Sequence, residues 1–223
     1  MRLKAIIPVR KGSVRVKNKN TRLFCKKNIL IYKIEQLKRV PQIEEIIVNS
    51  DCEYMLSIAS NLNVKPVKRD KYYASSDVPI NEVWKNIAEN INSDIVLYAN
   101  ATSPLVKDES IIESINIYNS LNLYDKKESL NSVTDVKEFL WMNGKPVNYR
   151  QEAQPKSQDL PLVFHPNFAI NIISRNLMIR NNTIISNNFE PYFLDKIESI
   201  DIDDEEDFMI AEMLYEKKIT GEI

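Results

Sequence analysis

The chain has 223 residues, and its 30 Lys and Arg nearly balance its 31 Asp and Glu, which gives a formal net charge of −1. This length suits one substantial α/β core better than two small ones. The neutral balance argues against a nucleic-acid-binding protein, which would be strongly basic, and no apolar run approaches the roughly 20 residues of a membrane span.

Strand-like and helix-like patterns alternate along the chain. Short apolar runs predict strands over 3–9, 44–50, 94–100, 128–133 and 167–174. Apolar residues at helical spacing predict helices over 29–40, 52–62, 80–91 and 108–120. This alternation indicates a three-layer α/β fold with a mostly parallel central sheet, whose ligands bind at the carboxyl ends of the strands.

The pattern lapses between about 140 and 166, where Pro, Gln and Asn dominate. We expect this segment to be a protruding insertion, either a substrate loop or a dimerisation arm. No internal repeat or linker divides the rest, so residues 1–223 are predicted to form a single domain.

The ends and cysteines bear on location. The opening "MRLKAIIPVR" is too short for a secretory signal, and Pro8 interrupts its apolar run. Cys25 and Cys52 are the only cysteines and are expected to be reduced thiols. These features predict a cytoplasmic protein.

A basic loop follows the first predicted strand. It carries five cations in ten positions: Arg10, Lys11, Arg15, Lys17 and Lys19. With the backbone N–H groups near its Gly and Ser, such an array suits a polyphosphate. Neither a Walker loop nor a dinucleotide fingerprint is present. From charge alone, a solvated basic turn is an equal alternative.

The segment 198–208, "ESIDIDDEEDF", is the second candidate. Its alternation of Ile and Asp is strand-like, so Asp201 and Asp203 are predicted to point to one side and to bind a divalent cation. The alternative is that they belong to a solvated helix cap, which is our interpretation of Glu205, Glu206 and Asp207. A polyphosphate loop and paired acids together favour metal-assisted phosphoryl or nucleotidyl transfer.

Six blocks of sequence carry a resemblance to a known family. They are "AIIPVRKGSVRVKNKN", "VNSDCEYMLSIA", "KRDKYYASSDVPINEV", "ANATSPL", "SQDLPLVFHPNFAINI" and "IDIDDEEDF". In this order, over nearly the whole chain, they resemble the acylneuraminate cytidylyltransferases, which include the CMP-sialic acid synthetases. The resemblance implies a nucleotide-binding fold, CTP as co-substrate, Mg²⁺ as cofactor, an acidic 2-keto-3-deoxy sugar as acceptor, pyrophosphate release and a homodimer.

The resemblance also implies roles for individual residues. Catalysis falls to Arg10, Lys19, Asp201 and Asp203, and the two aspartates are the implied metal ligands. The implied nucleotide site comprises Arg10, Gly12, Ser13, Arg15, Lys19, Asn20, Arg69, Ser75 and Ser76. The implied sugar site comprises Asn100, Thr102, Ser103, Arg150, Gln158, His165 and Asn167.

Two departures from the family pattern stand out. Val14 takes a place where many members have Lys, so the cation is expected to come from Arg15. Asn100 replaces the usual Gln, which favours an acceptor other than ordinary sialic acid.

Arg150 is the basic residue that we expect to bind the substrate carboxylate, with a solvated loop arginine as the equal alternative. His165, the only histidine, is more often structural than catalytic in such a setting.

Two other functions stay open. One is a CTP-dependent transferase for a phosphorylated acceptor, for which Lys145, Arg150, Lys156 and Arg175 offer cations. The other is a non-catalytic nucleotide-binding subunit, which would not need both aspartates.

Overall fold

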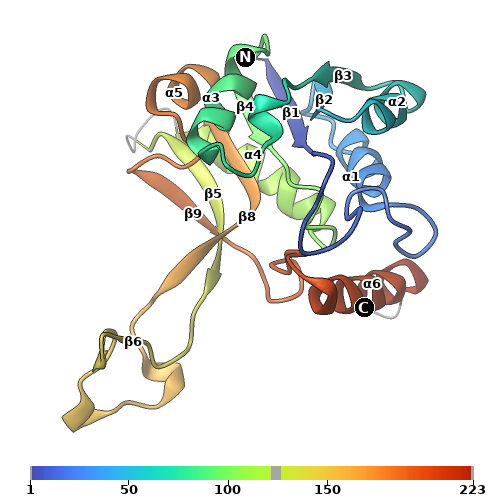
Figure 1. Ribbon diagram of the computed structural model, residues 1–223. Coiled ribbons are helices and arrows are strands. Elements are labelled where there is room, and N and C mark those ends of the chain that lie inside the picture. Colours follow the sequence, from blue (N-terminus) through green and yellow to red (C-terminus); the bar gives the residue numbers. More distant parts are fainter. Residues whose placement is uncertain (1, 122–126, 222–223) are drawn as a thin grey trace.

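A computed structural model describes residues 2–121 and 127–221. Its centre is a seven-stranded sheet of order β3-β2-β1-β4-β8-β5-β9, in which β8 alone runs antiparallel to its neighbours (Figure 1). The strands are β1 (Leu3–Pro8), β2 (Glu45–Ser50), β3 (Lys65–Lys68), β4 (Ile95–Tyr98), β5 (Ser129–Asp135), β8 (Phe164–Ser174) and β9 (Phe189–Phe193). The predicted mostly parallel sheet is confirmed.

Helices cover both faces of this sheet, as a three-layer fold requires. They are α1 (Ile29–Lys38), α2 (Glu53–Asn61), α3 (Ile80–Glu89), α4 (Asp108–Leu121), α5 (Arg175–Asn181) and α6 (Glu205–Thr220). Ala5 and Ile7 of β1 face a core shared with α1, α2, α4 and α6. Ile6 points the other way, into a core with α3 and α5. This alternation along one strand separates the two layers.

The predicted strands and helices are present with ends shifted by a few residues, whereas two strands of the central sheet and two helices were missed. β3 and β9 are short and only partly buried, so they carry little apolar signal. α5 has seven residues and follows β8 directly. The last helix, α6, was recognised only by its acidic start, and its helical pattern was not read further.

The insertion protrudes from the sheet as an arm. β5 and β8 stay paired as far as Asp135 and Phe164, and the chain between them, residues 136–163, forms a lobe outside the layers (Figure 1). The arm therefore begins and ends a few residues before the predicted 140–166. Inside it, the short strands β6 (Trp141–Met142) and β7 (Lys145–Pro146) form a hairpin. Its two-residue turn is Asn143–Gly144, and both residues have positive φ, as a primed turn needs.

Side chains hold the arm in shape. Asn148 accepts a hydrogen bond from the Leu140 backbone N–H at 2.9 Å and donates to the Glu138 carbonyl at 2.8 Å. The rings of Phe139 and Tyr149 pack edge to face with centroids 5.0 Å apart. These contacts hold the base of the β6–β7 hairpin together.

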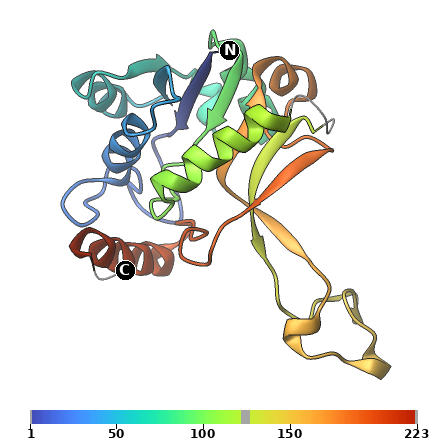
Figure 2. The same cartoon turned by 180° about the vertical axis from the view of Figure 1, so that it is seen from behind.

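Phe24 joins the basic loop to two helices. Its ring is fully buried and packs edge to face on Phe208 and Tyr215 of α6, at centroid distances of 5.4 and 5.3 Å. Tyr32 of α1 lies 6.2 Å away on another side. Through this cluster the carboxyl-terminal helix is held against the loop that follows β1 (Figure 2).

Replacing Phe24 by Ala is expected to lower the free energy of unfolding by about 3–5 kcal/mol, because it leaves a cavity among three aromatic rings. The neighbouring Leu23 is 67 % exposed, and Leu23→Ala should change stability by less than ~0.5 kcal/mol. Urea denaturation of both variants measures the difference. Equal effects would contradict the role given to this cluster.

Candidate functional site

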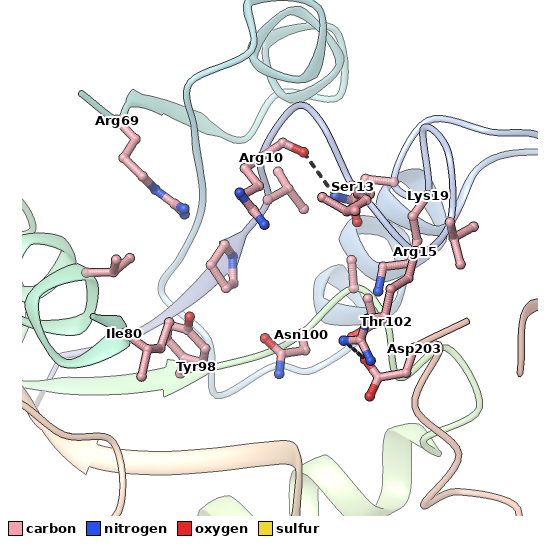
Figure 3. Close-up of a pocket in the computed structure, with 17 residues that line it drawn as sticks. Arg10, Ser13, Arg15, Lys19, Arg69, Ile80, Tyr98, Asn100, Thr102 and Asp203 are labelled. Atoms are coloured by element: carbon pink, nitrogen blue, oxygen red, sulfur yellow. Dashed lines mark hydrogen bonds and ion pairs between the residues drawn. The ribbon is translucent and has the colours of Figure 1, made fainter. Parts of the chain in front are cut away.

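A cavity of about 280 Å³ opens at the carboxyl ends of β1 and β4 (Figure 3). The chain leaves these adjacent strands in opposite directions across the sheet, from β1 to β2 and from β4 to β5, which is where open α/β sheets bind ligands. Of the predicted site residues, nine line this cavity: Arg10, Ser13, Arg15, Lys19, Asn20, Arg69, Asn100, Thr102 and Asp203.

The basic loop meets the acidic segment across this cavity. Arg15 Nη2 lies 2.7 Å from Asp203 Oδ1, and Lys19 Nζ donates a hydrogen bond to the Ile202 carbonyl. These contacts join residues more than 180 positions apart in the sequence. The structure thus brings the basic loop against Asp203, whereas Asp201 does not line the cavity and contacts Ser103.

Arg10 ties the same loop to the segment that follows β3. Its Nη1 donates to the Ala74 carbonyl at 2.8 Å and to Ser76 Oγ at 3.3 Å. Gly12 turns the loop with φ of +78°, which a side chain would disfavour. Asn20 is buried and donates to the Arg10 carbonyl, so the loop closes on itself.

Asp201 and Asp203 lie in different surroundings. Asp201 is partly buried and accepts a hydrogen bond from Ser103 Oγ at 3.3 Å, whereas Asp203 is exposed. Burial raises the pKa of Asp201, the charge of Asp203 raises it further, and Lys19 and hydrogen bonds oppose the shift. Burial lowers the pKa of Lys19, against the attraction of both aspartates.

The predicted strand at 200–203 is wrong. This segment is irregular and is held to the sheet through the Ile202 N–H, which donates to the Thr102 carbonyl at 2.9 Å. The next residue, Asp204, begins α6 with a capping box shared with Asp207. The interpretation of Asp207 as part of a helix cap is therefore confirmed. Asp201 and Asp203 lie close together in an irregular segment, and not because they alternate along a strand.

Arg69 forms the far wall of the cavity. It is 5 % exposed, donates to Asn49 through Nε and Nη2 at 2.6 and 3.0 Å, and its pKa is lowered by burial. Ser75 and Ser76 lie just outside, in an adjoining hollow that Arg10 and Arg69 also line.

Sequence reasoning missed the apolar floor of the cavity. Tyr98 ends β4, and Ile80 and Val83 come from the first turn of α3 (Figure 3). Each reads as ordinary core in a sequence, and only the fold brings the three together beside Arg69. The mixture of apolar floor and cationic rim is suited to a ligand with a flat ring and an anionic tail.

The predicted sugar-site residues fall into two groups. Asn100 and Thr102 line the cavity and Ser103 reaches Asp201. Arg150 and Gln158 lie exposed on the arm, and neither they nor His165 lines this cavity. Their assignment to substrate stays a prediction that a single chain does not test.

His165 and Asn167 sit at the root of the arm. His165 is exposed and lines a separate hollow there, beside Asp135 and Lys137. Asn167 is buried, accepts from Ser132 Oγ at 2.5 Å and donates to Thr134 Oγ1 at 3.0 Å, so its amide links β5 to β8.

Phe168 marks an irregularity in β8 beside the cavity. Its φ is +58°, which is rare for a bulky residue. Its carbonyl accepts from the Asn100 amide at 3.1 Å and from Asn171 at 2.9 Å. Backbone strain of this kind concentrates at functional sites, and the sequence offered no signal for it.

Metal ligation by protein groups alone is not supported. Within residues 2–121 and 127–221, no group of three or more His, Cys, Asp or Glu side chains is placed to hold a metal ion. Two carboxylates nonetheless suit Mg²⁺, which commonly binds one or two carboxylates and takes its other oxygens from substrate phosphates and water. Asp201 and Asp203 fit that partial donor set.

Comparison with known proteins gives a consistent result. A family model described as cytidylyltransferase matches residues 4–220. N-acylneuraminate cytidylyltransferase of Escherichia coli is 28 % identical over 96 % of the chain, which spans only 52 % of that protein. CMP-N,N'-diacetyllegionaminic acid synthase of Legionella pneumophila is 29 % identical, with 97 % of both chains covered. Pseudaminic acid cytidylyltransferase of Campylobacter jejuni is 23 % identical, with 94 % of both covered.

Solved structures agree on the fold. CMP:2-keto-3-deoxy-manno-octonic acid synthetase complexed with CTP superposes with a TM-score of 0.73 at 10 % identity, covering 98 % of this chain and 100 % of the other. 4-Diphosphocytidyl-2C-methyl-D-erythritol synthase from Anaerococcus prevotii gives 0.71 at 14 % identity, with 96 % of both chains covered.

Asp201→Asn is expected to stabilise the protein at pH 7. Because burial raises the pKa of Asp201 in the folded state, this carboxyl favours folding most at low pH and loses that contribution as the pH rises through the folded pKa. The amide removes the cost of the buried charge. The melting temperature at pH 7 should therefore be higher for Asp201→Asn than for the unmodified protein.

The matched control is Asp203→Asn, which loses the pair with Arg15 and relieves only the repulsion that Asp203 exerts on Asp201, not its burial, so its gain should be smaller. The gain in Asp201→Asn should vanish below about pH 4, where the carboxyl is protonated in both states. A lower melting temperature for Asp201→Asn at pH 7 would contradict this account. Calorimetry at both pH values makes the measurement.

Proposed function

This chain belongs to the cytidylyltransferase family, and we propose that it transfers CMP from CTP to an acidic 2-keto-3-deoxy sugar of the sialic acid type, with release of pyrophosphate. The observation that carries the proposal is the cavity in which the basic loop faces Asp203, with Asp201 close enough to attract Lys19. The relatives named above, which act on nonulosonate sugars by their names, support the acceptor class.

CTP fits the cavity with its base over the apolar floor near Tyr98 and its triphosphate toward the loop. Arg10, Lys19 and the backbone N–H groups around Gly12 and Ser13 are the groups that would bind phosphate oxygens. Arg15 would exchange its contact with Asp203 for one with phosphate. A triphosphate can take over these contacts because it carries more negative charge than a single exposed carboxylate.

The reaction joins the anomeric oxygen of the sugar to the α-phosphorus and breaks the bond to the β-phosphate oxygen. The hydroxyl proton passes to one of the two aspartates, and Arg10 and Lys19 stabilise the charge that grows on the leaving pyrophosphate. We propose Mg²⁺ as the cofactor, held by Asp201, Asp203 and phosphate oxygens, where it would supply further charge neutralisation.

Two alternatives are less well supported. Lys145, Arg150 and Lys156, the cations considered for a phosphorylated acceptor, lie on the arm and do not line this chain's own cavity, and the names of the relatives favour a nonulosonate acceptor. Arg175 instead donates to the Ala88 carbonyl at the far side of the sheet. A non-catalytic nucleotide-binding subunit would have no use for a partly buried carboxylate beside the phosphate loop.

Lys19→Met should lower kcat/KM by about 10²-fold or more, the usual effect of removing one group that stabilises transition-state charge. Lys17→Met is the matched control, since Lys17 lies in the same loop, is exposed and does not line the cavity. The rate of pyrophosphate release from CTP is measured for both variants, and equal losses in both would contradict the role of Lys19.

The acceptor class is tested by following pyrophosphate release from CTP by the unmodified protein with a panel of nonulosonate sugars and sugar phosphates. Turnover with sugar phosphates alone would rule out the proposed acceptor class.

We also propose a homodimer, in a cytoplasmic location where CTP is available. The arm exposes large apolar side chains that the single chain leaves uncovered, namely Trp141, Met142, Val147 and Leu162, each more than half exposed. Burying them against a second copy would place Arg150 and Gln158 near the partner's cavity. Within the described residues, none of the helices is both long and apolar enough to span a membrane.

Light scattering at working concentration should give twice the mass of one chain, and Trp141→Asp should shift it toward the monomer. Tyr54→Asp, at a large exposed side chain on α2 far from the arm, is the control and should leave the mass unchanged. A monomer for the unmodified chain would contradict the dimer.

A further inference from the structure

A second cavity, of about 320 Å³, lies behind the loop that follows β4. It lies between α1 and α6, and the rings of Tyr32 and Tyr215, one from each helix, make one wall with centroids 4.6 Å apart. Lys33 and Gln36 of α1 and Lys218 of α6 point toward it from the other sides. None of these residues takes part in the site described above.

Lys33 is a buried cation with only neutral partners. Its side chain is 2 % exposed, and Nζ donates to Gln36 Oε1 at 2.7 Å and to the Ser103 carbonyl at 2.9 Å. An ammonium has three N–H donors. One donor of Lys33 is therefore left for the cavity.

Lys218 repeats this arrangement from the opposite helix. Its Nζ donates to the Leu105 and Val106 carbonyls at 3.3 and 3.2 Å, which again leaves one donor. Among the described residues, no carboxylate lies within ion-pair distance of Lys33 or Lys218.

The nearby carboxylates already have other partners. Glu35 binds Lys27 through both oxygens at 2.6 and 2.7 Å. Asp108 binds the Arg39 fork at 2.5 and 3.0 Å. Glu35 and Arg39 also line the cavity, and Asp108 attracts both lysines from a distance, but neither ammonium has an ion-pair partner of its own among the described residues.

An unpaired charge in such a place is costly unless a counter-charge arrives. Burial lowers the pKa of Lys33 to about 7, and repulsion from Lys218 contributes to the shift. An anion between the two ammonium groups would relieve both costs.

We propose that this cavity is a second ligand site, which binds a small phosphate-type oxyanion between Lys33 and Lys218. The donors arrive from two helices as separate point charges, which suits a tetrahedral oxyanion with several acceptor oxygens. A planar carboxylate prefers an arginine fork, and the fork of Arg39 is already taken by Asp108.

The site is coupled to the first cavity through backbone. Lys33 and Lys218 hold the carbonyls of Ser103, Leu105 and Val106 from behind, while the Ser103 hydroxyl contacts Asp201 on the other side of the loop. An anion that draws the two ammonium groups together would therefore fix the loop that positions Asp201.

The test is titration calorimetry with inorganic pyrophosphate and, separately, inorganic phosphate. Lys218→Met and Lys33→Met should each bind one anion fewer per chain than the unmodified protein, or bind it at least tenfold more weakly. Lys217→Met is the matched control, because Lys217 is the exposed neighbour on α6. Counting sites per chain separates this cavity from any anion bound near Arg10.

A local readout complements the calorimetry and does not depend on the folding of Lys33→Met. In the unmodified protein, pyrophosphate should slow reductive methylation of Lys218 but leave Lys217 unchanged, as read by peptide mass spectrometry. The proposal is overturned if Lys218→Met binds either anion with the stoichiometry and affinity of Lys217→Met, or if Lys218 gains no protection.

Discussion

The candidate site depends on the electrostatic contact between the basic loop after β1 and the acidic segment before α6. Arg15 pairs with Asp203, and Lys19 binds the carbonyl between the two aspartates. The positive loop by itself would be a solvated turn, and the acids by themselves would be a helix cap. Only their meeting across one cavity gives a site that can hold a polyanion and accept a proton.

The rest of the fold maintains that contact. The adjacency of β1 and β4 opens the cavity, and the Ile202 N–H holds the acidic segment to the loop after β4. Phe24 packs the loop on α6, whose capping box begins one residue after Asp203. Stability and function are opposed at Asp201, because the burial that positions this carboxyl also disfavours its charge.

Patterns local in the sequence predicted five of the seven strands of the sheet and four of the six α-helices that the structure describes, and they placed the basic loop directly after the first strand. The apolar pattern of a sequence reflects which residues are buried, so the run that contains Ile6 and Ile7 predicted a strand without information on the tertiary structure. The strand assignment at 200–203 failed because alternation of Ile and Asp also suits an irregular segment pinned at one buried position, Ile202. Tyr98, Phe168 and Lys33 were not found, since their roles come from neighbours that lie far away in the sequence.

The most direct test of the central claim is a crystal structure of the chain with Mg²⁺ and a non-hydrolysable CTP analogue. The account predicts the triphosphate between the basic loop and the acidic segment, with Lys19 on phosphate oxygens and Arg15 released from Asp203. A triphosphate bound elsewhere, with the Arg15–Asp203 pair intact, would contradict it.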